Sequence, residues 1–91
     1  IQGGTMKRLI EETDDDGFSP LLGEVVTLLC ANYFYTGKLV GANSDFVEIE
    51  DPAIIYETGE WTLAAWKDVQ ALGCKTLRVR TASIEAYGKL K

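Results

Sequence analysis

The stretch from Tyr33 to Asp51 reads YFYTGKLVGANSDFVEIED. It holds two runs of apolar and β-prone residues on either side of the turn-forming sequence GANSD. Gly37 and Gly41 lie inside the first run. Glycine weakens a strand unless the sheet bends sharply or another backbone comes close. The stretch therefore predicts a hairpin in a strongly bent sheet.

Alternating apolar and polar residues predict further strands on both sides of this hairpin. In the sequence TLRVR, for example, Leu77 and Val79 share one face and the two arginines share the other. Pro52 interrupts the third strand and predicts an edge or a bulge there, after which the run AIIYE can resume the strand. The expected strands are 24–31, 33–42, 46–50, 76–80 and 83–87.

Three other segments carry helix or turn signals. Residues 6–12 can form about two helical turns, and Ser19-Pro20 fits the start of a one-turn helix. Residues 61–72 place apolar side chains at a helical spacing, and Gly73 is a suitable stop. We therefore expect 59–73 to be an insertion with a short helix, and a strand is the second alternative.

Length and composition predict one small domain. The chain has 91 residues, of which 46% are hydrophobic and 25% charged, as is ordinary for a globular protein. Residues 1–5 carry no pattern, so the predicted domain is 6–91. No apolar run approaches the ~20 residues of a membrane span, and the N-terminus lacks the apolar centre of a signal peptide. We therefore expect a cytoplasmic protein with no membrane partner.

The charged and reactive residues point away from catalysis. The chain has 14 acidic and 9 basic residues, a net charge of −5, which makes it a poor general binder of phosphate. It has no histidine, no nucleophile-elbow motif and no phosphate-cradling glycine loop, so we expect no enzymatic activity and no cofactor. The two cysteines, Cys30 and Cys74, cannot complete a zinc site and are expected to be small buried residues.

The acidic residues of the third strand leave a metal site as the weaker alternative. Glu48, Glu50 and Asp51 lie close together in the sequence and could bind a cation. Without further ligands, a solvated acidic face is the expected structure, so no metal is predicted.

The order of the predicted elements resembles that of the Sm-like family, which includes the LSm proteins and bacterial Hfq. The sequence TGKLVGANSDFVEIED is similar to the first family motif, with Gly37, Leu39 and Gly41 in place. The sequence LRVRTASIEAY is similar in rhythm to the second motif, in which Arg80 takes the arginine position. Thr81 and Ala82 stand where the family has Gly and then Asn or Asp.

The resemblance implies a mostly β fold: a small, strongly bent, five-stranded Sm-like barrel with an N-terminal helix. It covers residues 20–87 apart from the insertion 59–73, which falls between strands three and four. In the family, strand four of one subunit pairs with strand five of the next. The resemblance therefore implies a cyclic homo-oligomer of about five to seven copies.

A barrel split open between its last two strands also leaves unpaired edges. We expect these segments to find hydrogen-bond partners on adjoining copies rather than within their own subunit. The expected interface residues are Thr76, Leu77, Arg78, Val79, Ser83, Ile84, Glu85, Ala86 and Tyr87.

The resemblance further implies a site for RNA. In the family, a base stacks on a side chain of the first loop, a loop Asn reads the base edge, and the arginine of the second motif covers the other face. The base-reading position aligns here with Glu48 or Val47, which supply no amide. The candidate RNA-binding residues of this chain are Asn43, Asp45, Phe46 and Arg80.

Alternatives stay open for the two most prominent candidates. Arg80 either contacts RNA or forms an ion pair with Glu48 or Glu50. Phe46 either stacks on a base or packs at the barrel rim. Two functions follow: a ring that binds single-stranded RNA, or an acidic scaffold ring that binds protein and no RNA.

Overall fold

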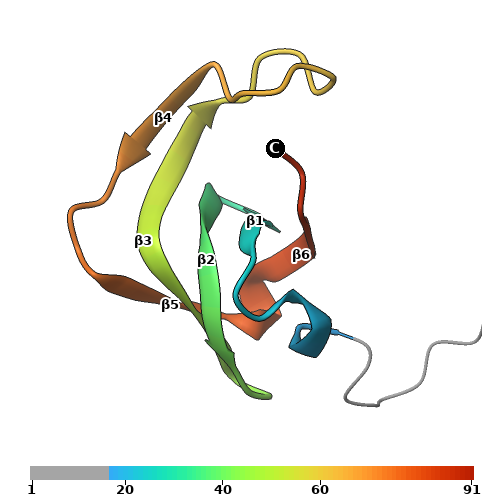
Figure 1. Ribbon diagram of the computed structural model, residues 1–91, viewed down its shortest axis with the longest axis vertical. Coiled ribbons are helices and arrows are strands. Elements are labelled where there is room, and N and C mark those ends of the chain that lie inside the picture. Colours follow the sequence, from blue (N-terminus) through green and yellow to red (C-terminus); the bar gives the residue numbers. More distant parts are fainter. Residues whose placement is uncertain (1–16) are drawn as a thin grey trace, which may run out of the picture.

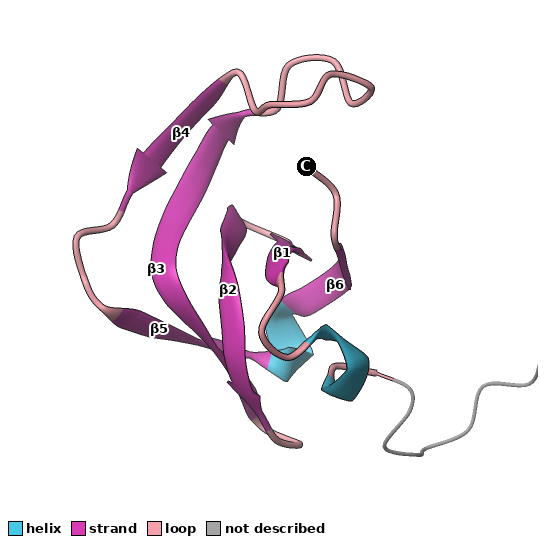
Figure 2. Ribbon diagram, viewed as in Figure 1, coloured by secondary structure: helices cyan, strands magenta, loops and turns pink. Residues whose placement is uncertain are grey.

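The computed structural model describes residues 17–91, which form a strongly bent antiparallel sheet of six strands (Figure 1). Two short 3-10 helices, η2 (Ser19–Leu21) and η3 (Thr81–Ser83), accompany the sheet (Figure 2). The helix predicted at 6–12 lies outside the described residues. The strands are β1 (Val25–Cys30), β2 (Phe34–Ala42), β3 (Phe46–Glu57), β4 (Asp68–Ala71), β5 (Thr76–Arg80) and β6 (Ile84–Gly88).

Strand β3 organises the sheet because it serves three neighbours. On one side it pairs with β2, and on the other its first part, 46–50, pairs with β5. Its second part, 53–57, pairs with β4, so β4 and β5 lie at opposite ends of β3 (Figure 1). The two parts join at Asp51, which has a left-handed φ of 51°, and at Pro52. The predicted irregularity at this proline is confirmed, and the strand resumes after it.

The hydrophobic core is formed by side chains of β1, β2, the first part of β3 and β5. Leu39 is fully buried, whereas its neighbours Lys38 and Val40 are exposed, as the alternation of the strand predicts. Fully burying one such aliphatic side chain stabilises the fold by about 1.5–3 kcal/mol. The buried cluster consists of Val26, Leu28, Cys30, Leu39, Val47, Ile49 and Val79.

The last two strands are each paired within the chain, on one side only. Strand β5 pairs with β3, and β6 pairs with β1. The expectation that they lack partners within their own subunit is therefore wrong. The sheet is nevertheless open between them, because β5 and β6 do not pair with each other. Within residues 17–91, each of these two strands keeps one edge without a partner strand.

The predicted count of five strands and the predicted helix at 61–72 are both wrong. Residues 61–67 form turns and bends, and 68–71 form β4. The strand alternative therefore holds for the end of the insertion. The reason is that β3 continues past Pro52 and offers 53–57 as a pairing edge. Backbone pairing of this kind readily outweighs a helical spacing, since local propensity is a weak determinant.

No helix within residues 17–91 has the length and apolar character needed to cross a bilayer.

Gly37 and Gly41 lie in the same strand and allow a matched test of the close approach in the sheet. A Cβ at Gly37 would lie 3.0 Å from the Glu50 backbone oxygen and 3.2 Å from Ile49 Cβ. A Cβ at Gly41 would meet only Glu48 Cβ, at 3.7 Å. We predict that Gly37→Ala lowers the free energy of unfolding by about 1–3 kcal/mol.

The control variant Gly41→Ala should be neutral or stabilising by up to about 1 kcal/mol, because alanine loses less conformational entropy than glycine in a strand. Urea unfolding of the two variants measures both values. Equal stability of the two variants would contradict the close approach at Gly37.

Candidate nucleic-acid interface

Two loops that are distant in the sequence meet at one corner of the sheet. One is the turn between β2 and β3, and the other is the corner where β5 passes into η3. The register places Phe46 opposite Arg80. The Thr81 amide donates to the Asp45 carbonyl oxygen (3.0 Å), and the Thr81 hydroxyl donates to the Ser44 carbonyl oxygen (2.8 Å). The two family-like motifs therefore form a single surface.

The side chain of Asn43 shapes the first loop. Its Oδ1 accepts hydrogen bonds from the backbone N–H groups of Asp45 (2.7 Å) and Phe46 (2.9 Å). This is an Asx turn, in which the side chain replaces a backbone acceptor. The oxygen of Asn43 thus holds the turn, and its amide nitrogen is the group that it can offer a ligand.

Phe46 packs against a basic side chain. The guanidinium carbon of Arg78 lies 4.8 Å from the centre of the Phe46 ring, a cation–π arrangement. Arg78 Nε in turn donates to Glu48 Oε2 at 3.4 Å. Arg78 therefore covers one face of the ring, and a base that stacks on this face has to displace it.

Arg80 is exposed, and within residues 17–91 it takes part in no ion pair. The two carboxylates expected as its partners are bound elsewhere: Glu48 pairs with Arg78, and Glu50 pairs with Lys75 at 3.8 Å. Arg80 therefore forms an ion pair with neither Glu48 nor Glu50, contrary to that alternative. Its side chain borders a polar hollow of about 440 Å³ lined by Ser44, Asp45, Phe46, Arg80, Thr81 and Ala82.

A larger groove of about 750 Å³ follows the opening between β5 and β6. Leu77 and Val79 contribute from β5, and Cys30 lines the groove from the end of β1. Burial raises the pKa of the Cys30 thiol, and the negative charge of Glu85 raises it further. The fold therefore favours the protonated thiol, which is a poor nucleophile. Burial likewise raises the pKa of Tyr35 in the same groove.

The two cysteines differ in environment. Cys30 belongs to the core, as predicted, but Cys74 is exposed, and the prediction that it is buried is wrong. Cys74 lies in the connection between β4 and β5, which contributes no residue to the buried cluster.

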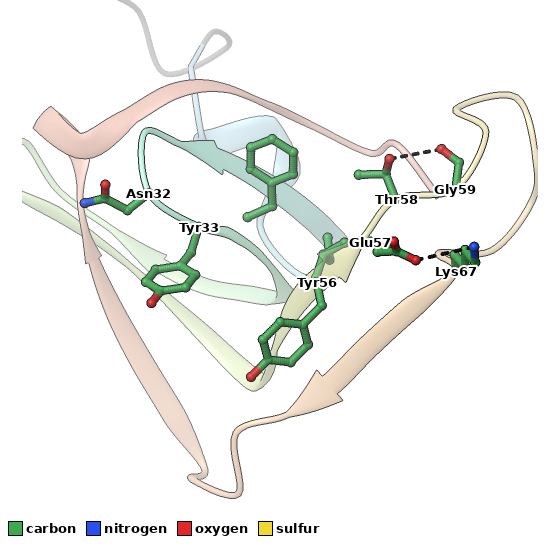
Figure 3. Close-up of a pocket in the computed structure, with 9 residues that line it drawn as sticks. Asn32, Tyr33, Tyr56, Glu57, Thr58, Gly59 and Lys67 are labelled. Atoms are coloured by element: carbon green, nitrogen blue, oxygen red, sulfur yellow. Dashed lines mark hydrogen bonds and ion pairs between the residues drawn. The ribbon is translucent and has the colours of Figure 1, made fainter.

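A third hollow, of about 590 Å³, separates the β1–β2 turn from the end of β3 (Figure 3). Tyr33 and Tyr56 line it, and about half of each side chain is exposed. Lys67 closes one side through an ion pair with Glu57 at 3.4 Å. No local sequence pattern brings these tyrosines together, because their proximity depends on how the β1–β2 turn and the end of β3 lie in the fold.

Among the residues that the structure describes, the carboxylates of β3 belong to no group that could hold a metal ion. Within residues 17–91, no three His, Cys, Asp or Glu residues are arranged to hold a metal ion. Glu48 and Glu50 face basic side chains of the β5 region instead.

The structure brings the four predicted RNA-binding residues together at one corner and places the expected interface residues along β5, β6 and the η3 link. Comparison with protein-family models, curated proteins and solved structures finds no match for this chain. A function for this chain therefore has to follow from its strand topology and from the chemistry of the residues at the corner.

The contrast between the two cysteines yields a labelling test. We predict that iodoacetamide modifies Cys74 rapidly in the folded protein and Cys30 at least about tenfold more slowly, because access to Cys30 requires local opening. The raised pKa of Cys30 lowers its thiolate fraction, at any given pH, below that of a thiol with the usual pKa. Mass spectrometry of the labelled peptides gives both rates.

In denaturant the two sites should react at similar rates, which serves as the control. Equal rates in the folded protein would contradict the burial of Cys30.

Proposed function

We propose that this chain is a ring-forming Sm-like subunit that binds single-stranded RNA where the β2–β3 turn meets β5. The observation that carries the proposal is the state of Arg80. It is exposed at a polar hollow, and no carboxylate of residues 17–91 forms an ion pair with it. A guanidinium in this state is suited to bind a phosphate or to cover a base.

The strand order supports the assembly. Three meandering strands are followed by β4, β5, a 3-10 turn and β6, and β6 returns to β1. The edges of β5 and β6 that have no partner strand within residues 17–91 flank the open side of the sheet. Pairing β5 of one copy with β6 of the next satisfies both edges, and repetition of this head-to-tail contact closes a ring of about five to seven copies.

A ring brings together more basic side chains than one acidic subunit can offer to RNA. Each copy contributes one Arg80, so a strand that follows the ring meets several guanidinium groups, and the contacts reinforce one another. Base recognition is relaxed, because Asn43 uses its oxygen in the turn and Arg78 covers one face of Phe46. We therefore propose binding that tolerates sequence and depends steeply on salt.

A second candidate function is an acidic ring that binds protein instead of RNA. The observation that favours it is the neutralisation of basic side chains beside the site. Arg78 and Lys75 are both paired with carboxylates of β3, and the whole chain carries a net charge of −5.

Oligonucleotide binding across a salt series separates the two candidates. We predict that fluorescently labelled oligo-U and oligo-A bind with similar affinity at low salt. Arg80→Ala should weaken both and reduce the slope of log affinity against log salt by about one for each phosphate that an Arg80 side chain binds. The matched control is Lys75→Ala, which removes the same charge from a side chain already paired with Glu50.

Light scattering on the same samples reports the assembly. Intact rings that bind neither oligonucleotide at low salt would exclude the RNA function and leave the acidic scaffold. A monomer at micromolar concentration would contradict the ring itself. An equal effect of the two variants would contradict the role assigned to Arg80.

A further inference from the structure

Three backbone carbonyl groups of the loop between β3 and β4 bind one ammonium group, that of Lys91. Lys91 Nζ donates to the backbone carbonyl oxygens of Thr58 (2.9 Å), Glu60 (2.8 Å) and Ala65 (3.3 Å). The three acceptors belong to one loop that lies far from Lys91 in the sequence. In Figure 1 the chain end lies beneath this loop, consistent with these contacts.

Two aromatic rings complete the surroundings of this ammonium group. Lys91 Nζ lies 4.4 Å from the centre of the Trp66 ring and 6.0 Å from that of Trp61. The two indoles meet edge to face with centres 5.7 Å apart. The ring of Trp61 also lies beside that of Phe34 in β2, with ring centres 6.3 Å apart. The negative faces of aromatic rings attract a cation, tryptophan most strongly.

The chemistry of the loop fits one class of ligand. A primary ammonium has three N–H donors, and the loop presents three carbonyl acceptors. We propose that the β3–β4 loop is a binding site for a primary ammonium and that the Lys91 side chain is its intramolecular ligand. The planar guanidinium of arginine does not match this three-fold set of acceptors.

The site gives Lys91 a defined role in the fold. Residues 58–67 contain no strand, and they adjoin the hollow of Figure 3 through Thr58, Gly59 and Lys67. Held by Lys91, this loop is tied to the segment that follows β6. The insertion thus docks on its own chain. The proposal depends neither on ring formation nor on RNA binding.

Substitution of Lys91 tests the site, with the two tryptophans as reporters. Trp61 and Trp66 are the only tryptophans of the chain, and both lie in the loop. We expect Lys91→Met, which keeps the length of the side chain but removes the ammonium, to abolish the coupled circular dichroism signal of the indoles and to shift their emission to longer wavelength. The matched control is Lys89→Met, because Lys89 pairs with Glu24 and contacts neither indole.

Two outcomes would overturn the proposal: an unchanged indole signal in Lys91→Met, or an equal loss in the Lys89 control. A second measurement uses the unaltered protein and does not rely on a variant. In a proton–nitrogen spectrum of the lysine ammonium groups, Lys91 should appear as a slowly exchanging signal displaced by the Trp66 ring current. If all lysine ammonium groups exchange alike, without such a displaced signal, the site is refuted.

Discussion

Strands β4 and β5 pair with the same edge of β3, and this division of one edge sets the arrangement of the whole sheet. One strand cannot pair with all of this edge, because Asp51 and Pro52 change its direction midway. Strand β5 takes the first part and β4 takes the second. As a result β5 ends beside the β2–β3 turn, and η3 then directs β6 to β1. The corner that holds the candidate site and the opening beside it both follow from this division.

The register of β5 on β3 decides which arginine is available to a ligand. Arg78 lies opposite Glu48, and Lys75, just before β5, forms an ion pair with Glu50. Arg80 lies opposite Phe46, two residues further along, where β3 carries no carboxylate. A shift of two residues would place Arg80 beside Glu48 and neutralise it. The candidate function thus depends on backbone pairing as much as on the presence of an arginine.

Local patterns in the sequence predict most of the strands, because alternation and turn residues are local signals. The strand at 76–80 has the predicted bounds, and Gly37 marks a close approach, as expected for a glycine inside a strand. Strand β4 and the pairing of Glu48 are missed, since both depend on register between distant segments. The Lys91 contacts are missed because their acceptors are backbone carbonyls, which every residue carries.

Hydrogen–deuterium exchange across a dilution series tests most directly whether the open edges of β5 and β6 join neighbouring copies. The amides of 76–80 and 84–88 should gain protection as the protein concentration rises, because new backbone hydrogen bonds form between copies. Amides of β2, which lies between β1 and β3, should not change. Protection of β5 and β6 that is the same at every concentration would contradict edge-to-edge assembly.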